Sequence, residues 1–198
     1  MSVRVCVLII LGAASVAIAT DLTRAFFTPR DTPCPSIPAI GDFNVSRYAG
    51  TWYENKRFTF AFQENTKCVR IKFFERDDGG FNIIFYRQLI WPRPVEIRTR
   101  LVLEPTLSPG TFDAKTKIGD NWVYAGTYVV VVAGYTDATM VYSCQDLWFE
   151  TALEAAWIMT RDRGVLTSAD ETSLSNTATS LGINFSKFSS TSQSDCIA

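Results

Sequence analysis

The chain has 198 residues, a formal net charge of −1 at neutral pH and no histidine. Without histidine, a histidine-ligated haem and any catalysis by an imidazole base are excluded, and the balanced charge argues against a nucleic-acid-binding surface, which would be clearly basic. Hydrophobic residues make up 47% of the chain and aromatic residues 13%. Such a composition can fill the core of one domain or line a cavity.

Residues 1–19 are predicted to be a secretory signal peptide. Arg4 supplies a positive charge, residues 5–16 form an apolar run, and residues 17–19 read Ala-Ile-Ala, a small-x-small cleavage pattern. The apolar run is too short for a confident membrane span, so no integral membrane span is expected. Residues 20–198 are then expected to form a single secreted, extracellular domain. Its net charge is −2, since 18 basic and 20 acidic residues remain once Arg4 is lost.

The cysteines and two glycosylation sequons also fit export. Cys6 leaves with the signal peptide, and an even number of cysteines remains: Cys34, Cys68, Cys144 and Cys196. Four cysteines in an oxidising compartment allow three pairings, between which spacing alone does not choose. Asn44 and Asn184 each begin an Asn-x-Ser sequon, so both are candidate glycosylation sites on the surface.

Eight segments have the pattern of β-strands separated by turns. They are residues 52–62, 68–75, 81–87, 95–104, 112–118 and 128–133, followed by segments near 140–144 and 152–161. Residues 77–80 read Asp-Asp-Gly-Gly, a strong hairpin signal, and Pro92 and Pro94 place a loop before the fourth strand. The fourth strand alternates apolar and charged residues, which is typical of a sheet with one face in water. Residues 128–133 are apolar throughout, so both faces of that strand are expected to be covered.

One amphipathic helix is predicted after the strands. Ser168 and Glu171 form a capping box, with Ser168 as the N-cap. Leu174, Ala178 and Leu181 recur at helical spacing, and Gly182 can end the helix. Eight strands followed by one helix predict an all-β protein, an eight-stranded antiparallel up-and-down β-barrel with one C-terminal external α-helix. A barrel of eight strands can hold one small ligand inside.

Three short motifs resemble those of the lipocalins, in particular the branch of apolipoprotein D, Lazarillo and the insect bilin-binding proteins. Gly50-x-Trp52 opens the first strand, Thr136-Asp137 lies between the sixth and seventh, and Arg161 ends the eighth. The second motif departs from the family pattern, because Ala138 stands where a tyrosine is usual. The resemblance implies that Arg161 packs over Trp52 at the closed end of a lipocalin calyx. It makes all five motif residues fold determinants, not ligand contacts.

The same resemblance implies a disulfide pairing and a ligand site. The pairs would be Cys34–Cys144 and Cys68–Cys196. Ligand would lie along the inner wall and mouth, where strand alternation and aromatic character nominate Phe58, Phe60, Val69, Ile71, Phe73, Ile83, Phe85, Trp91, Val95, Ile97, Leu101 and Tyr142. For each of these residues plain packing is an equal alternative. An arginine cluster at Arg87, Arg93, Arg98 and Arg100 is interpreted as an exposed polar face rather than a site for an acidic headgroup.

The resemblance implies a carrier that binds a small hydrophobic ligand without a covalent bond. Candidate ligands are fatty acids, sterols, retinoids, carotenoids and bilins; no metal or required cofactor is expected, although a bilin or carotenoid chromophore is a candidate ligand. A cell-surface receptor and a homo-oligomer stay open as partners. One alternative is an enzyme or an antioxidant, which would need a free thiol or exposed methionines at Met140 and Met159. Another is a protein-interaction module with a filled barrel.

Overall fold

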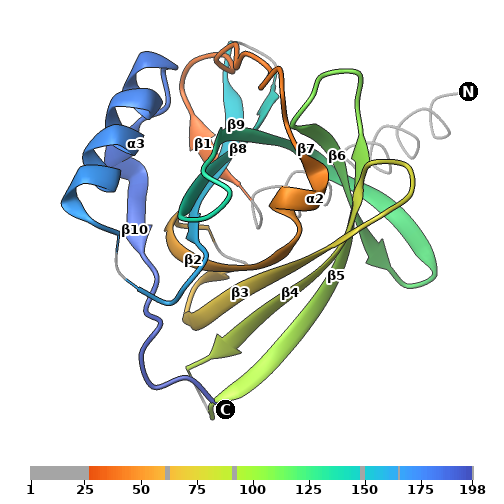
Figure 1. Ribbon diagram of the computed structural model, residues 1–198, viewed down its shortest axis with the longest axis vertical. Coiled ribbons are helices and arrows are strands. Elements are labelled where there is room, and N and C mark those ends of the chain that lie inside the picture. Colours follow the sequence, from red (N-terminus) through yellow and green to blue (C-terminus); the bar gives the residue numbers. More distant parts are fainter. Residues whose placement is uncertain (1–26, 61–62, 91–92, 148–149, 165, 198) are drawn as a thin grey trace, which may run out of the picture.

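The computed structural model describes residues 27–60, 63–90, 93–147, 150–164 and 166–197, and eight strands dominate this part of the chain (Figure 1). These strands are β2 (Gly50–Phe58), β3 (Thr66–Glu75), β4 (Phe81–Leu89), β5 (Val95–Pro105), β6 (Thr111–Ile118), β7 (Asn121–Ala133), β8 (Ala138–Asp146) and β9 (Ala152–Thr160). The predicted signal peptide, residues 1–19, lies outside the described residues.

The eight strands close into an antiparallel up-and-down barrel. Each strand pairs with the next along the chain, and β9 pairs with β2 to complete the cylinder. The predicted fold class is therefore confirmed, including one long helix outside the barrel. Two short strands extend the sheet: β1 (Thr28–Arg30) pairs with β9, and β10 (Phe188–Ser190) pairs with β2. Closure leaves no open edge along the apolar residues 128–133 of β7, which would otherwise invite pairing with other chains.

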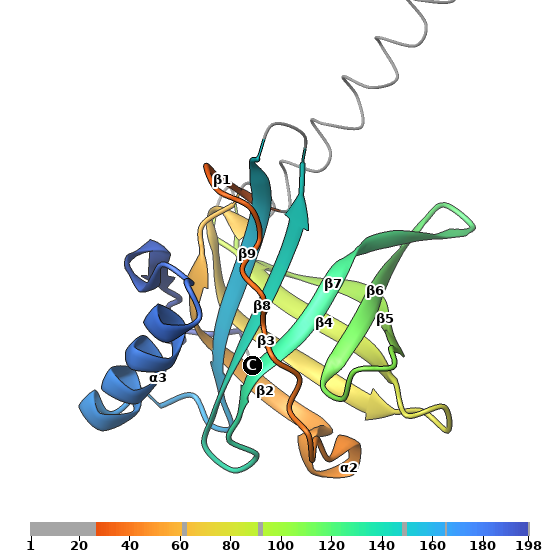
Figure 2. The same cartoon turned by 90° about the horizontal axis from the view of Figure 1, so that it is seen from above.

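Strand β7 begins seven residues earlier than predicted, at Asn121 rather than Tyr128. Gly126 suggests a strand breaker in the sequence, but here it lies within the strand at φ +120°, beside a register shift in the pairing with β6. A bulge of this kind bends a strand without ending it. The β6–β7 hairpin consequently extends well beyond the rest of the barrel wall (Figure 2).

One end of the barrel is closed by aromatic side chains. The short helix α2 (Val45–Tyr48) precedes β2 and lies across this end (Figure 2). Tyr48, Trp52, Phe73 and Phe81 are all buried and pack together, with ring centroids 5.2 to 6.0 Å from that of Tyr48. Gly50 adopts φ +99° where the chain turns from α2 into β2, a conformation that favours glycine.

Helix α3 (Ser168–Ser180) covers the outer face of the barrel where β2, β8 and β9 meet (Figure 1). Leu174 and Ala178 of the helix pack on that face, and the half-buried Val131 and Val132 of β7 lie at the margin of the same cluster. The N-cap differs from the prediction by one residue. Thr167, not Ser168, occupies that position, and its hydroxyl accepts a hydrogen bond from the Asp170 amide at 3.1 Å.

Two disulfides fasten the ends of the chain to the barrel. The pairs are Cys34–Cys144 and Cys68–Cys196, so the predicted pairing is confirmed. The segment before α2 runs over the outside of β8 (Figure 2). The fully buried Glu154 ties both ends to the wall, because it pairs with Arg30 at 3.2 Å and with Lys187 at 2.6 Å.

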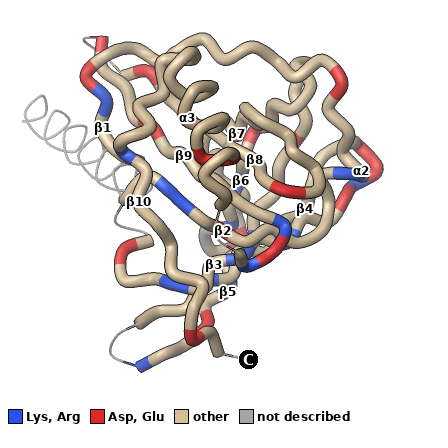
Figure 3. Tube along the Cα trace, turned by 60° about the vertical axis from the view of Figure 1, so that its left-hand side comes forward, with Lys and Arg blue, Asp and Glu red and all other residues tan. Residues whose placement is uncertain are grey.

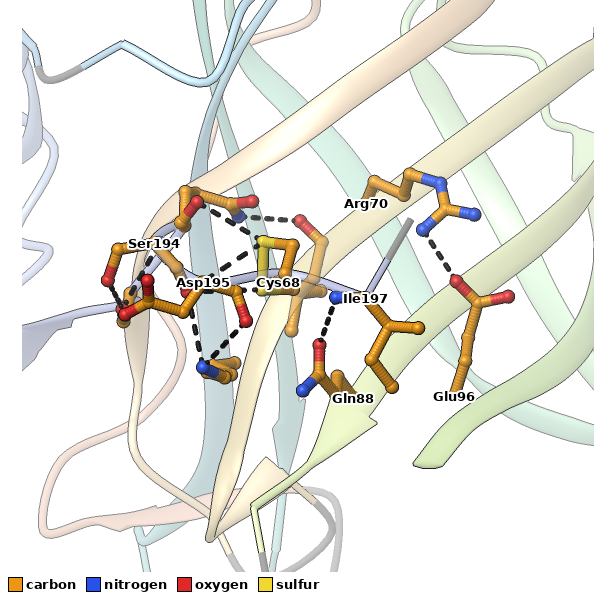
Figure 4. The surroundings of a disulfide bond; sticks show 12 residues. Cys68, Arg70, Gln88, Glu96, Ser194, Asp195 and Ile197 are labelled. Atoms are coloured by element: carbon orange, nitrogen blue, oxygen red, sulfur yellow. Dashed lines mark hydrogen bonds and ion pairs between the residues drawn. A yellow bond between two sulfur atoms is a disulfide. The ribbon is translucent and has the colours of Figure 1, made fainter. Parts of the chain in front are cut away.

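The C-terminal tail seals a gap between β2 and β3. These strands pair only between Gly50 and Tyr53 of β2. Beyond that point the Gln193 side chain donates to the carbonyls of Glu54 and Val69, each at 2.8 Å, and so bridges the two strands. The tail then crosses β3 and reaches β4, where the Ile197 amide donates to Gln88 (Figure 4).

Candidate functional site

A cavity of about 380 Å³ lies inside the barrel above the aromatic floor. It reaches solvent beside the β6–β7 hairpin, where Val123 and Tyr124 line it and are 41% and 51% exposed. None of the lining residues is charged, and most are apolar. They are Phe27, Phe60, Gln63, Ile71, Phe73, Ile83, Phe85, Thr99, Leu101, Leu103, Ala114, Thr116, Val123, Tyr124, Ala125, Gly126, Thr127, Tyr128, Ser143, Gln145, Trp157 and Met159.

Half of the twelve nominated residues line this cavity. They are Phe60, Ile71, Phe73, Ile83, Phe85 and Leu101. Val69 is fully buried and Ile97 half-buried, but neither lines the cavity, while Val95 is 48% exposed. Trp91 lies outside the described residues. Whether the lining residues contact a ligand stays a prediction.

Phe58 faces away from the cavity because β2 contains a bulge. The pairing with β9 shifts between Glu54 and Lys56, so Asn55 is an extra residue and the alternation of side chains reverses after it. Arg57 therefore points inward. Phe58 packs instead under β10 with Phe188, at a centroid distance of 4.7 Å.

Tyr142 also lies on the outer face, contrary to its nomination. Its hydroxyl donates to the buried Glu154 at 2.6 Å, and burial together with this bond raises the pKa of the phenol. Cys144, two residues later, bonds to Cys34 outside the barrel. Residues two apart in a strand share a face, so the expected disulfide already carried the signal that Tyr142 faces outward.

Sequence reasoning missed the part of the cavity wall that β6 to β9 contribute. Ala114, Ser143 and Thr116 are small, and nothing in their chemistry marks a ligand wall. Trp157 and Met159, by contrast, alternate with residues that pack under α3. That alternation in β9 was a signal that sequence reasoning could have used.

A buried polar network lies behind the wall, under the C-terminal tail. Gln63 lines the cavity; its amide donates to Glu54 at 2.7 Å and accepts from the Trp157 indole at 3.0 Å. Arg57 pairs with Glu54 at 2.6 Å, and Thr191 of the tail bonds to both. Each charge is thus compensated, as a buried ion pair requires.

The floor of the barrel has the contact that the motifs imply. The Arg161 guanidinium carbon lies 3.8 Å from the centre of the Trp52 ring. Its nitrogens donate to five backbone carbonyls, those of Arg47, Tyr48, Ala49, Thr51 and Tyr135. Burial lowers the pKa of Arg161, and the hydrogen bonds satisfy the charge. Thr136 and Asp137 are exposed in the β7–β8 turn.

A chain of hydroxyls connects this floor with the cavity. Thr139 donates to the Val132 carbonyl at 2.7 Å, and Tyr48 lies 3.2 Å from the Thr139 oxygen and 3.3 Å from the Tyr128 oxygen. Because the Thr139 proton is committed to Val132, Tyr48 donates to Thr139 and Tyr128 donates to Tyr48. Burial raises the pKa of Tyr48 to about 12 and that of Tyr128 well above its ordinary value.

Both sequon asparagines are exposed N-cap residues. Asn44 caps α2, and its side-chain oxygen accepts from the Arg47 amide at 2.8 Å. Asn184 caps the short turn of Phe185–Lys187 and accepts from the Ser186 amide at 3.1 Å. In both caps the side-chain oxygen accepts the capping hydrogen bond, so the cap does not use the amide nitrogen, the atom that carries a glycan.

The described residues offer little to redox or metal chemistry. All four cysteines among them are in disulfides. Met140 and Met159 are at most 1% exposed, so neither methionine can act as a surface reductant.

Within the described ranges no group of three metal-ligating side chains occurs, and no helix is long and apolar enough to cross a membrane. Acidic and basic residues are interspersed over the drawn part of the chain (Figure 3).

Comparison with known proteins agrees with this geometry. No protein-family model matches the chain. Apolipoprotein D from Oryctolagus cuniculus is 25% identical over 190 residues, 96% of each chain. Outer membrane lipoprotein Blc from Escherichia coli is 36% identical over 75 residues, which are 38% of this chain and 41% of that protein.

Solved structures have the same fold. Insecticyanin from Manduca sexta matches with a TM-score of 0.69 at 21% identity, over 86% of this chain and 90% of that chain. Lobster apocrustacyanin A1 matches with a TM-score of 0.64 at 17% identity, over 84% of this chain and 92% of that chain. The predicted resemblance to the lipocalins is confirmed, because the chain is similar to apolipoprotein D over nearly its whole length and has the fold of insecticyanin.

Proposed function

We propose that the protein is a carrier, not an enzyme, and that it binds a small hydrophobic molecule non-covalently in the barrel. The observation that carries this proposal is the cavity of about 380 Å³, whose lining residues are uncharged and mostly apolar. A site of this size and character suits a small apolar ligand. Transfer of apolar surface from water supplies about 25 cal/mol per Å². A cavity of this kind also speaks against the filled-barrel alternative.

We further propose that residues 1–19 are removed on export and that residues 20–198 work outside the cell as one domain. Two disulfides support this, because such bonds persist in oxidising compartments. The exposed sequons at Asn44 and Asn184 are consistent with glycosylation there. This proposal includes a cell-surface receptor or a second copy of the chain as a partner of the exported protein.

The likeness to apolipoprotein D supports a lipid among the candidate ligands. The candidate set is the one that the resemblance to the lipocalins implies: fatty acids, sterols, retinoids, carotenoids and bilins. The nominated residues that line the cavity are the proposed contacts, namely Phe60, Ile71, Phe73, Ile83, Phe85 and Leu101. Trp157 also lines it, so a bound ligand should quench tryptophan fluorescence.

A pair of tryptophan substitutions on β5 tests the cavity as the binding site. Thr99 lines the cavity, whereas Arg100 is exposed on the outer face of the same strand. We expect Thr99→Trp to fill the cavity and weaken binding of every ligand at least ten-fold, while Arg100→Trp leaves binding unchanged. Fluorescence titration with retinol, palmitate, cholesterol and biliverdin measures this. Equal affinities in the two variants would place the ligand elsewhere.

A further inference from the structure

The side chain of Tyr128 lies at the inner end of the cavity, next to the aromatic floor. It lines the cavity together with Phe73, and the centres of these two rings are 6.2 Å apart. Its hydroxyl oxygen lies 3.3 Å from that of Tyr48, which is part of the floor. The opening to solvent is beside Val123 and Tyr124, nearer the start of β7. A ligand that enters through this opening therefore reaches Tyr128 with its leading end.

The proton of the Tyr128 hydroxyl is already committed to Tyr48. Thr139 gives its only hydroxyl proton to the Val132 carbonyl at 2.7 Å, so it can bond to Tyr48 only as an acceptor. Tyr48 must then donate to Thr139, because the opposite choice would leave two oxygens 3.2 Å apart with no proton between them. The oxygen of Tyr48 accepts from Tyr128 in turn. The Tyr128 proton consequently points at Tyr48 and not into the cavity.

Tyr128 therefore offers a ligand only a hydrogen-bond acceptor. A phenol oxygen can accept a hydrogen bond while it donates its own proton, and within the described residues no group donates to the Tyr128 oxygen. A ligand hydroxyl can fill this place. The oxygen of an aldehyde, an ether or a carboxylate would instead bring a second acceptor against the first, with no proton to join them.

The other polar groups of the wall do not discriminate in this way. Thr99, Thr116 and Ser143 have hydroxyls that can rotate, so each can donate or accept as a ligand requires. The amides of Gln63 and Gln145 contain a donor and an acceptor. None of the described lining residues is charged, so a carboxylate at the inner end would be buried without a cation, which is costly.

We propose that the ligand is an amphipathic alcohol that enters hydroxyl first and donates a hydrogen bond to the Tyr128 oxygen. This inference rests on the carrier function and names the class of its ligand. Tyr128 is then a residue that determines specificity, since it supplies a contact that only the alcohol can complete. The alcohol can belong to a polyene, a sterol or an alkyl chain, and matched probes separate the three.

The test compares alcohols with molecules of similar shape that lack the donor. The probes are retinol against retinal and retinyl methyl ether, cholesterol against its methyl ether, and hexadecanol against palmitate, each measured by fluorescence titration. A single neutral hydrogen bond accounts for about three-fold to ten-fold in affinity. We expect wild type to prefer the alcohol by that factor. The alcohol that binds most tightly identifies the body of the ligand.

Three tyrosine variants assign the preference to Tyr128. Tyr128→Phe keeps the ring and removes the oxygen, so each alcohol should fall to within about two-fold of its matched compound. Tyr124→Phe is the control, because Tyr124 also lines the cavity but lies at the mouth, where its hydroxyl pairs with Thr127 at 2.9 Å. It should leave the preference unchanged.

Tyr48→Phe gives a readout that a merely structural role of Tyr128 would not produce. This change removes the acceptor of the Tyr128 proton, which can then turn into the cavity and meet a carbonyl oxygen. Retinal should therefore bind about as tightly as retinol in this variant.

The possible failures contradict different parts of the account. The role of Tyr128 is wrong, while the carrier function stands, if wild type does not prefer the alcohols or if Tyr128→Phe, folded by circular dichroism, keeps the preference. The same conclusion follows if Tyr124→Phe loses the preference as fully, or if retinal gains nothing in folded Tyr48→Phe. If wild type binds none of these probes and no biliverdin, the carrier function itself is contradicted.

Discussion

At the scale of single residues, Arg161 joins two segments of the chain that are distant from it in the sequence, residues 47–51 and Tyr135. Its hydrogen bonds reach the end of α2, the start of β2 and the turn after β7, and its guanidinium covers Trp52. Strand ends and turns of this kind would otherwise leave carbonyl groups without protein partners. Arg161 therefore acts on the stability of the closed end rather than on ligand.

We expect Arg161→Ala to lower the free energy of unfolding by about 3 kcal/mol, because it removes charged hydrogen bonds and a cation–π contact together. Arg163→Ala is the matched control. Arg163 is exposed and lies 5.2 Å from the Tyr53 ring, and such a surface contact is worth about 0.5–1 kcal/mol. Urea denaturation measures both. Equal losses of unfolding free energy in the two variants would show that the closed end of the barrel depends on the loss of a positive charge and not on the contacts of Arg161.

The buried hydroxyl of Tyr48 makes the free energy of unfolding fall as the pH becomes alkaline. Burial raises its pKa to about 12 in the folded protein, against about 10 in an unfolded chain. The stabilisation is fully present below pH 10 and is lost as the pH rises through 12, because only the unfolded chain gives up the proton in that interval. We expect a loss of about 2–3 kcal/mol over this range.

Urea denaturation at pH 9 to 12 measures the Tyr48 effect. Tyr48→Phe cannot ionise, so its stability should fall less over the same interval, with Tyr128 responsible for part of what remains. A pH dependence that is identical in wild type and variant would contradict the assignment.

At the scale of elements, the C-terminal tail is a structural part of the barrel. It fills the gap between β2 and β3, and the Cys68–Cys196 bond holds it there. The second disulfide, Cys34–Cys144, fastens the N-terminal segment to the outer face of β8. The two bonds close loops of similar length, with sequence separations of 128 and 110 residues.

Removing either bond, as Cys68→Ser with Cys196→Ser or as Cys34→Ser with Cys144→Ser, should lower the free energy of unfolding by about 4–5 kcal/mol in the chain-entropy account. Only the loss of the Cys68–Cys196 bond should also open the gap between β2 and β3 that the tail fills. Limited proteolysis should then cleave after residue 190, and the backbone amides of β2 near Glu54 should exchange faster. The second pair controls for general destabilisation. Tail cleavage to the same extent in both variants would contradict the sealing role.

At the scale of the whole molecule, the alternation of apolar and polar residues along the strands was enough to predict the barrel. The β4–β5 pairing has no irregularity, so Ile83, Phe85 and Leu101 lie where the sequence puts them. A single extra residue at Asn55 reverses Phe58, and no local pattern announces it. Strands β6 to β8 also line the cavity with small residues such as Ala114, Thr116 and Ser143, whose role depends on the closed barrel and not on their own chemistry.

The central claim is that the barrel carries an apolar molecule in its cavity, and native mass spectrometry of the protein purified without denaturation tests it most directly. We expect wild type to show one non-covalently bound organic molecule per chain, released on denaturation, and Thr99→Trp to show the bare chain. A bare mass for wild type, together with no saturable binding of any added ligand, would contradict the account.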